Sequence, residues 1–268
     1  MAYTLGDVSW DVFFEHLAQE EILGDMGVID FPFINDQRMT GSSPRLKKWF
    51  PTIDMEVLPA VLRAMYNCLK PLTHCYVFVP KWRELSNIVS MAEHAGFMVA
   101  NRLIWDHIYK GMGYSWRDSH TDILFCKKGR RALNHAGGRD VLSYPKVTCG
   151  YPTEKPVGLA EELILNSSRP NDIIVDPFMG SGVFGQVAIR NGRRFMGTDI
   201  NPDAFEEANE RAYNAVAGVS AFVHAFGIER EQLVLPGDPA YPKRKSIYGE
   251  QGKKPPINSQ HQGARGKT

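Results

Sequence analysis

The sequence has 268 residues, of which 43% are hydrophobic and 11% aromatic, and its formal net charge is +1. This length and composition predict one large α/β domain or two small ones, and the charge gives no overall sign of nucleic-acid binding. The four cysteines have neither CxxC spacing nor a paired histidine motif, which argues against a zinc site and a disulfide framework. No apolar run approaches membrane-spanning length and the N-terminus lacks a signal-peptide pattern, so we expect a soluble cytoplasmic protein without a membrane partner.

Near the N-terminus, residues 3–7 (YTLGD) precede an amphipathic pattern that predicts a helix from Trp10 to Leu23. Asp7 fits the N-cap of that helix. Residues 26–30 then read as a short central strand, and the segment 30–33 (DFPF) lies at its carboxyl end. Open α/β sheets bind their ligands there, although the segment also fits a turn whose phenylalanines lie in the core.

The next stretch, residues 34–53, is polar and combines glycine, serine and proline with basic residues that include Arg38 and Arg45. It fits a solvated loop, or a lid that closes on phosphates and on an extruded base, because such contacts come mostly from Lys and Arg. Beyond it the hydrophobic periodicity predicts, in chain order, a helix over 55–69, a strand over 75–80, a helix over 82–95 and a strand over 97–105.

Aromatic and basic residues follow these elements. Trp105 ends the last strand and fits the core. Residues 108–118 interleave two tyrosines and a tryptophan with basic side chains, a composition typical of surfaces that bind unpaired bases. A further strand is predicted over 120–127 and begins with His120.

The most informative stretch is residues 173–182 (IIVDPFMGSG). Its three β-branched residues are typical of a strand buried on both faces of a parallel sheet, and Gly180 and Gly182 permit a sharp turn close to a ligand. A helix over 183–191 would point its unpaired N–H groups at that ligand. The next strand ends at Asp199, where an acid in a βαβ unit usually accepts hydrogen bonds from a ribose. The set predicts a nucleoside site, and the missing GxGxxG spacing and Walker lysine argue against NAD and ATP.

Helices are also predicted over 153–168, before this stretch, and over 203–217, after it. After residue 236 the composition shifts to Pro, Gly, Lys and Gln without a hydrophobic period. We expect residues 237–268, in which seven Lys and Arg residues stand against two acids, to form a flexible basic tail. The tail is either a solvated end or a nucleic-acid-binding arm.

Four motifs together resemble those of the amino-methylating DNA methyltransferases, which use S-adenosylmethionine. The runs 176–182 (DPFMGSG) and 197–202 (GTDINP) resemble the family's cofactor motif, and 151–157 (YPTEKPV) its threonine-glutamine-lysine-proline segment. The run 30–33 resembles the catalytic Asp-Pro-Pro-Tyr, and its place before the cofactor motif matches the permuted β class; the resemblance covers residues 3–215. It implies cofactor contacts from Asp7, Thr153, Lys155, Asp176, Phe178, Gly180, Ser181, Gly182, Asp199 and Asn201.

The resemblance also implies which residues would contact the target base. An exocyclic amine is a poor nucleophile because its lone pair is delocalised into the ring, and two acceptors on its N–H groups restore that lone pair. Asp30 would supply a carboxylate and Phe31 a main-chain carbonyl, while Phe33 would stack on the base. Phe31 and Phe33 stand where the family carries proline and tyrosine, and Pro32 matches. Further contacts to DNA would come from Arg38, Arg45, Trp105 and His120.

We therefore expect one doubly wound α/β domain with a mostly parallel, seven-stranded-type sheet, helices on both faces and the motif order of the permuted class. The methyltransferase domain would span residues 1–236. It would comprise a catalytic half over 1–105, a short target-recognition insertion over 106–150 and a cofactor half over 151–217, with the tail over 237–268 following.

The expected activity is methyl transfer from S-adenosylmethionine to the exocyclic amine of adenine in duplex DNA, after base flipping. The acid of the DFPF segment favours adenine, because cytosine-specific relatives more often carry serine there. Cytosine amino methylation, an RNA substrate and a cofactor- or DNA-binding protein without catalysis stay open as alternatives. We expect no metal, and a prokaryotic or phage-infected cell; homodimerisation is common in this class.

Overall fold

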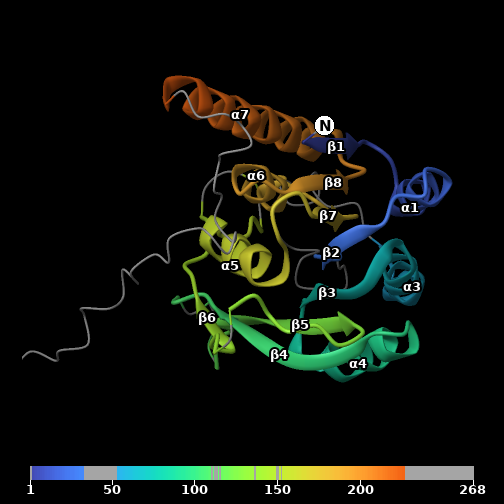
Figure 1. The fold of residues 1–268 in the computed structure, drawn as a ribbon. Helices are drawn as coiled ribbons and strands as arrows, with labels where there is room; N and C mark the ends of the chain where they lie inside the picture. The colour runs from blue at the N-terminus through green and yellow to red at the C-terminus, as the bar shows by residue number, and fades with distance from the viewer. Residues whose placement is uncertain are drawn as a thin grey trace, which may run out of the picture.

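The structure is a computed structural model that describes residues 2–32, 53–109, 111, 114, 116–135, 137–148, 151 and 153–226, of which 220–226 by backbone alone (Figure 1). Its described strands form one sheet of eight in the order β1-β8-β7-β2-β3-β5-β4-β6. The strands are β1 (Tyr3–Gly6), β2 (Gly24–Ile29), β3 (Leu69–Val79), β4 (Met98–Asp106), β5 (His120–Lys128), β6 (Val141–Ser143), β7 (Ile173–Asp176) and β8 (Arg194–Thr198).

Neighbouring strands are parallel except where β5 pairs antiparallel with β3 and β4. The prediction of an α/β fold with a mostly parallel sheet is confirmed. The sheet has eight strands because the short strands β1 and β6 pair at its two ends. Its direction of winding reverses between β7 and β2, since β7 leads outward to β8 while β2 leads the opposite way to β3.

The helices cover both faces of the sheet (Figure 1). One face packs against α1 (Trp10–Gln19), α3 (Leu58–Cys68) and α4 (Leu85–His94), and 3-10 turns at Met55–Val57 and Trp82–Glu84 lead into the last two. The other face packs against α5 (Val157–Ser167) and α6 (Val183–Arg190), and α7 (Pro202–Phe226) lies against α6 and β1. Each face therefore has its own apolar core, as expected for a doubly wound sheet.

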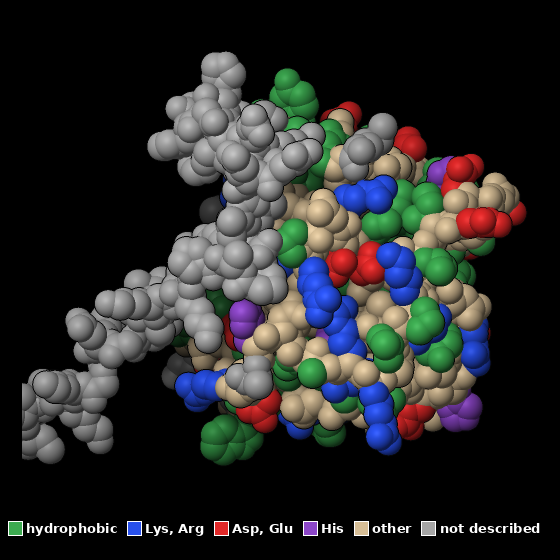
Figure 2. All heavy atoms as spheres, viewed as in Figure 1, with side chains coloured by type: hydrophobic (Ala, Val, Ile, Leu, Met, Phe, Trp, Pro, Cys, Tyr) green, Lys and Arg blue, Asp and Glu red, His purple; other side chains and the backbone are tan. Residues whose placement is uncertain are grey.

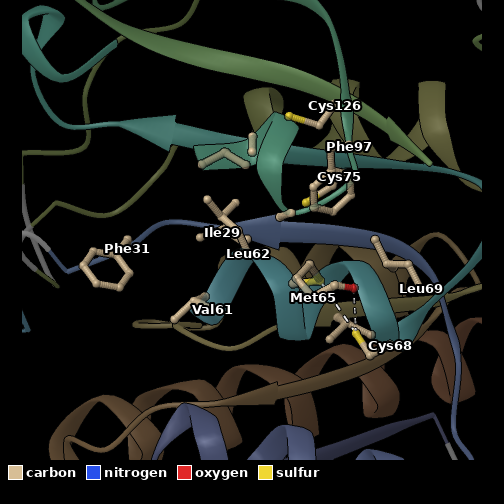
Figure 3. Packing of buried hydrophobic residues seen from close by; sticks show 14 of the residues in the cluster. Ile29, Phe31, Val61, Leu62, Met65, Cys68, Leu69, Cys75, Phe97 and Cys126 are labelled. Carbon is tan, nitrogen blue, oxygen red and sulfur yellow. Dashed lines mark hydrogen bonds between the residues drawn. The ribbon is translucent and has the colours of Figure 1, made fainter. Parts of the chain in front are cut away.

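The strand β2 shows how the sequence divides the two cores. Its alternating side chains send Met26 and Val28 into the core beneath α5 and α6, and Ile29 into the core beneath α3. Gly27 allows α3 to approach closely, because a Cβ there would lie 2.7 Å from the sulfur of Met65. Figure 3 shows residues of the core beneath α3, among them Ile29 and Met65, with Phe31 at the far end of the cluster. The core thus continues to the point where β2 ends.

Four predicted element boundaries are wrong, and two of them have a clear local reason. The helix expected to reach Leu23 ends at Gln19, because Glu21 adopts φ +52° and the Ile22 N–H donates to Leu17 O at 2.8 Å, closing a Schellman turn. The helix expected from residue 153 begins at Val157, since Pro156 has extended backbone angles. The strand expected from residue 75 begins at Leu69, and the last helix extends to Phe226.

On the face seen in Figure 2, Lys and Arg side chains are interspersed with Asp and Glu side chains, in keeping with the net charge of +1. Within the described part of the chain, no helix is both long enough and apolar enough to span a membrane.

Candidate active site

Three acidic residues lie at the carboxyl ends of three neighbouring parallel strands. Asp30 follows β2, Asp176 ends β7 and Asp199 follows β8, and the order β8-β7-β2 sets these strands side by side. The reversal of winding between β7 and β2 falls at the same place. Open α/β sheets bind ligands at such a switch point, outside the carboxyl ends of the strands.

The turn between β7 and α6 is built around Asp176, whose Oδ1 accepts the N–H of Phe178 at 3.0 Å. Burial raises the pKa of Asp176 to about 8, although the hydrogen bond from Phe178 opposes this shift. The negative charges of Asp30 and Asp199 raise this pKa further, whereas the charge of Lys155 lowers it. Asp176 therefore holds a proton at neutral pH and responds to any charge that enters the site.

Two glycines of this turn have left-handed backbone angles, with φ +50° at Gly180 and φ +74° at Gly182. A Cβ on Gly180 would lie 3.2 Å from the ring of Tyr151, and a Cβ on Gly182 would lie 2.7 Å from that of Ala208 on α7. Ser181 between them is buried. The DPFMGSG turn is thus enclosed by two other segments, which only a glycine backbone permits at this distance.

Asp199 ties the end of β8 to the glycine turn. Its Oδ2 accepts the N–H of Gly180 at 3.0 Å and its Oδ1 accepts the N–H of Asn201 at 2.9 Å. Burial raises the pKa of Asp199, and these two hydrogen bonds oppose the shift. Asn201 is buried and its Oδ1 accepts the N–H of Asp203 at the start of α7. Each carboxylate oxygen of Asp199 keeps a lone pair for a further donor.

The N-terminal segment reaches the same place through Thr198. The Thr198 hydroxyl lies 2.6 Å from Val8 O and 3.0 Å from Gly6 O, and it accepts the Val8 N–H at 3.3 Å. Asp7 is consequently held beside Asp199, with its side chain exposed. The alternative in which Asp7 caps the first helix is wrong, because the N-cap is Ser9.

The catalytic candidate Asp30 contacts a residue 125 positions away in sequence: the ammonium of Lys155 forms an ion pair with Asp30 Oδ2. The same ammonium lies 3.3 Å from Thr153 O and 5.0 Å from the centre of the Phe78 ring. Thr153 has φ +69°, which turns the segment away from helix before Pro156. The TEKP segment therefore meets the end of β2.

The residue after Asp30 links the two motifs. Phe31 is buried, and its ring packs edge-on against Phe178 of the glycine turn, with 5.2 Å between the ring centres. Pro32 is the last described residue of the catalytic segment. The predicted roles of Phe33, Arg38 and Arg45, and the basic tail, lie outside the described residues.

The two other candidates for DNA contact occupy different environments. Trp105 is buried, its indole N–H donates to Tyr144 O at 2.8 Å, and its ring meets His107 edge-on. His120 is exposed and opens β5; because β5 is antiparallel, His120 lies at the same end of the sheet as Asp30. Its Nε2 is 3.9 Å from the buried Asp122 carboxylate. The base-contact role of both residues stays a prediction.

The sequence reasoning missed two supports of the site. Tyr151 is buried against Gly180. Glu154 receives two hydrogen bonds from Arg211 of α7, at 2.9 and 2.6 Å, and Arg211 also binds Glu207. The position of Glu154 inside TEKP was the available signal, but its partner could not be read from the sequence. In the described part of the chain, no group of three His, Cys, Asp or Glu could hold a metal ion.

Fold and site together define a doubly wound α/β protein with a ligand site at its switch point and an acid beside it. A family model described as DNA methylase (N6_N4_Mtase) matches residues 28–210. The chain belongs to this family.

Relatives agree with this membership. The putative methylase YubD of Escherichia coli is 31% identical over 146 residues, which are 54% of this chain and 64% of YubD. The DNA adenine methyltransferase YhdJ of Escherichia coli is 51% identical over 53 residues, 20% of this chain and 18% of YhdJ. The chain thus spans less than two thirds of either protein. A crystal structure of the M1.HpyAVI–SAM complex has the same fold, with TM-score 0.62 at 20% identity, covering 78% of this chain and 99% of that one.

Proposed function

We propose that this protein transfers the methyl group of S-adenosylmethionine to the exocyclic amine of a base in DNA, and that the base is adenine. The observation that carries the proposal is the convergence of Asp30, Asp176 and Asp199 on one switch point, in a chain of the DNA methylase family. The turn between β7 and α6 is of a kind that binds a nucleoside cofactor. Asp30, at the end of the neighbouring strand β2, can then contact the target base.

The residues of the site fit this cofactor. S-adenosylmethionine carries a positive sulfonium, which favours a site lined by carboxyl groups. Asp199 holds two backbone N–H groups and keeps lone pairs that would accept the ribose hydroxyls, while the exposed Asp7 beside it would contact the adenine. Phe178 and Gly180 belong to the turn between β7 and α6 and would line the same site. A cation at this place favours the ionised form of Asp176, so binding of the cofactor should release a proton.

When bound, S-adenosylmethionine supplies an electrophilic methyl group. The chain's own residues prepare the nucleophile: Asp30 accepts one N–H of the amine and the Phe31 carbonyl accepts the other, which returns the lone pair to the nitrogen. As the nitrogen–methyl bond forms, the sulfur–methyl bond breaks and its electron pair stays on sulfur, and the nitrogen then loses a proton toward Asp30 or water. The contribution of the protein is therefore positioning and electrostatic stabilisation.

A duplex target requires that the base leave the helix stack, because the amine is otherwise out of reach. The exposed side chains of Tyr114 and Trp116, in the segment between β4 and β5, support this substrate, since aromatic faces stack on unpaired bases. His120 lies at the base of the same segment. Homodimerisation and a cytoplasmic location stay predictions.

The test is methyl transfer from labelled S-adenosylmethionine to unmethylated genomic DNA, followed by mass spectrometry of the digested nucleosides. Asp30→Ala removes the acceptor, and Asp25→Asn, at the opposite end of β2, is the matched control. A methylated adenine that vanishes with Asp30→Ala and persists with Asp25→Asn supports the proposal. No transfer to any nucleic acid, with the cofactor still bound in a calorimeter, would indicate a binding protein instead.

A second candidate is methyl transfer to the amine of cytosine, because the family model covers both N6 and N4 methyltransferases by name. The two reactions need the same acceptors and differ in the shape of the base pocket. A methylated cytosine in the same digest would keep the mechanism and overturn the choice of adenine.

A further inference from the structure

An ion pair joins the catalytic half of the chain to its cofactor half. The Lys155 ammonium contacts only one oxygen of Asp30, Oδ2, and among the described residues no donor reaches Oδ1. The Lys155 side chain is 9% exposed, whereas that of Asp30 is 34% exposed. One oxygen of Asp30 is therefore held by a nearly buried cation, in a side chain that is itself partly exposed.

Several contacts fix Lys155 in this place. Its ammonium also donates to Thr153 O at 3.3 Å and lies over the Phe78 ring. The neighbouring Glu154 is held by two hydrogen bonds from Arg211. The backbone on either side of the lysine is thus anchored to α7 and to the start of α5, so the ammonium has little freedom to move away from Asp30.

The position of the charge matters as much as the contact. The charge of Lys155 also acts on Asp176, which lies on the adjacent strand and feels both Asp30 and Lys155. Lys155 is thus a nearly buried cation that offsets the charge of Asp30 and lowers the pKa of Asp176 where a sulfonium would enter. A lysine whose only task was to bind the cofactor would not need to contact the carboxylate at the end of β2.

We propose that Lys155 is a positioning residue for methyl transfer: it holds Asp30 Oδ2 so that Oδ1 points at the N–H of the target amine. This inference rests on the proposed function and adds a role to it. Without the lysine, the Asp30 carboxylate could rotate about its side-chain bonds, and misplacement of a reacting group by about 1 Å can lower a rate by about 100-fold.

The experiment is a double-mutant cycle with Lys155→Met and Asp30→Asn, measured as kcat for methyl transfer and as Kd for S-adenosylmethionine. Lys155→Met keeps most of the side-chain volume and removes the charge. The control is Lys70→Met. Lys70 forms an ion pair at 2.8 Å with Asp25, which lies near the start of β2, at the opposite end of that strand from Asp30. Lys155→Arg, which keeps a cation, completes the set.

We expect Lys155→Met to lower kcat by about 10- to 100-fold while the cofactor Kd changes by less than about threefold. The double variant should be no slower than Asp30→Asn alone, because both changes remove one interaction. Lys155→Arg should retain more of kcat than Lys155→Met, and Lys70→Met should leave kcat unchanged. A weakened cofactor Kd together with additive losses of kcat would assign Lys155 to the cofactor and overturn the inference.

Urea unfolding of the four proteins of the cycle (wild type, Lys155→Met, Asp30→Asn and the double variant) separates this inference from the proposed function. If the ion pair exists, the double variant loses less free energy of unfolding than the sum of the losses in the two single variants. An active wild type with additive behaviour in both cycles would overturn the inference alone. A wild type that methylates no nucleic acid would overturn the proposed function, and with it the catalytic role of Lys155, whatever the unfolding cycle gives.

Discussion

The substitution Gly182→Ala is expected to destabilise the protein through two separate effects. The residue has φ +74°, where an L side chain costs about 1–2 kcal/mol. The new Cβ would also lie 2.7 Å from Ala208 Cβ and 2.8 Å from Ala208 Cα, so α7 must shift, and overpacking of this kind costs about 1–3 kcal/mol. The free energy of unfolding should fall by about 2–5 kcal/mol. This corresponds to a loss in Tm of about 4–20 °C for domains of this size.

Gly137→Ala provides the matched control. Gly137 has φ +85° and nothing lies within 4 Å of the position of its Cβ, so only the backbone effect remains. Thermal unfolding followed by circular dichroism, with urea unfolding at 25 °C, measures both variants. Gly182→Ala should lose about 1–3 kcal/mol more than Gly137→Ala. Equal losses, or a larger loss for Gly137→Ala, would refute the argument that the glycine turn is enclosed by α7.

Two further predictions concern Asp176 and Thr198. Burial raises the pKa of Asp176 to about 8, so between about pH 4 and pH 8 the folded protein holds a proton that the unfolded chain releases. The free energy of unfolding therefore falls as the pH rises through this range, and in the Asp176→Asn variant it should fall less between pH 5 and pH 8. If the urea midpoint of the variant changed with pH as steeply as that of the wild type, this prediction would be contradicted. Thr198→Val removes the hydroxyl that joins β8 to Gly6 and Val8, and should lower stability by about 1–2 kcal/mol and weaken cofactor binding. Calorimetry checks the second part, and an unchanged cofactor Kd would contradict the prediction that the Thr198 hydroxyl holds Asp7 in place for cofactor binding.

The sequence predicts the layout of the fold well, because the apolar runs are long and their periods distinct. Strand β7 is a run of β-branched residues and α3 has a clear helical period, and both lie where expected. The boundaries are less predictable. Glu21 and Thr153 adopt left-handed angles without being glycine, and nothing in their residue type indicates that a helix ends or starts beside them.

The site divides in the same way. The Asp176 turn and Asp199 can be found from sequence because they lie within one βαβ unit, where local order fixes their distance. The contacts of Asp30 with Lys155, of Gly180 with Tyr151 and of Glu154 with Arg211 depend on the order of the strands. Motif spacing carries no information about these pairs, because their partners come from different parts of the chain.

The strand order also explains how the permuted motif order is compatible with the proposed reaction. The strand β2, which carries the catalytic candidate, comes early in the chain, and the strands β7 and β8, which carry the candidate cofactor site, come late. Parallel pairing of β2 with β7 nevertheless places Asp30 next to Asp176. What the proposed reaction requires is that the ends of these strands are adjacent, not that they follow one another in sequence. The segment before α5 then supplies Lys155 across the junction, so an ion pair joins the two halves of the site in addition to the packing of Phe31 against Phe178. For this reason the coupling between Asp30 and Lys155 tests the assembly of the site as a whole, and not only the role of one lysine.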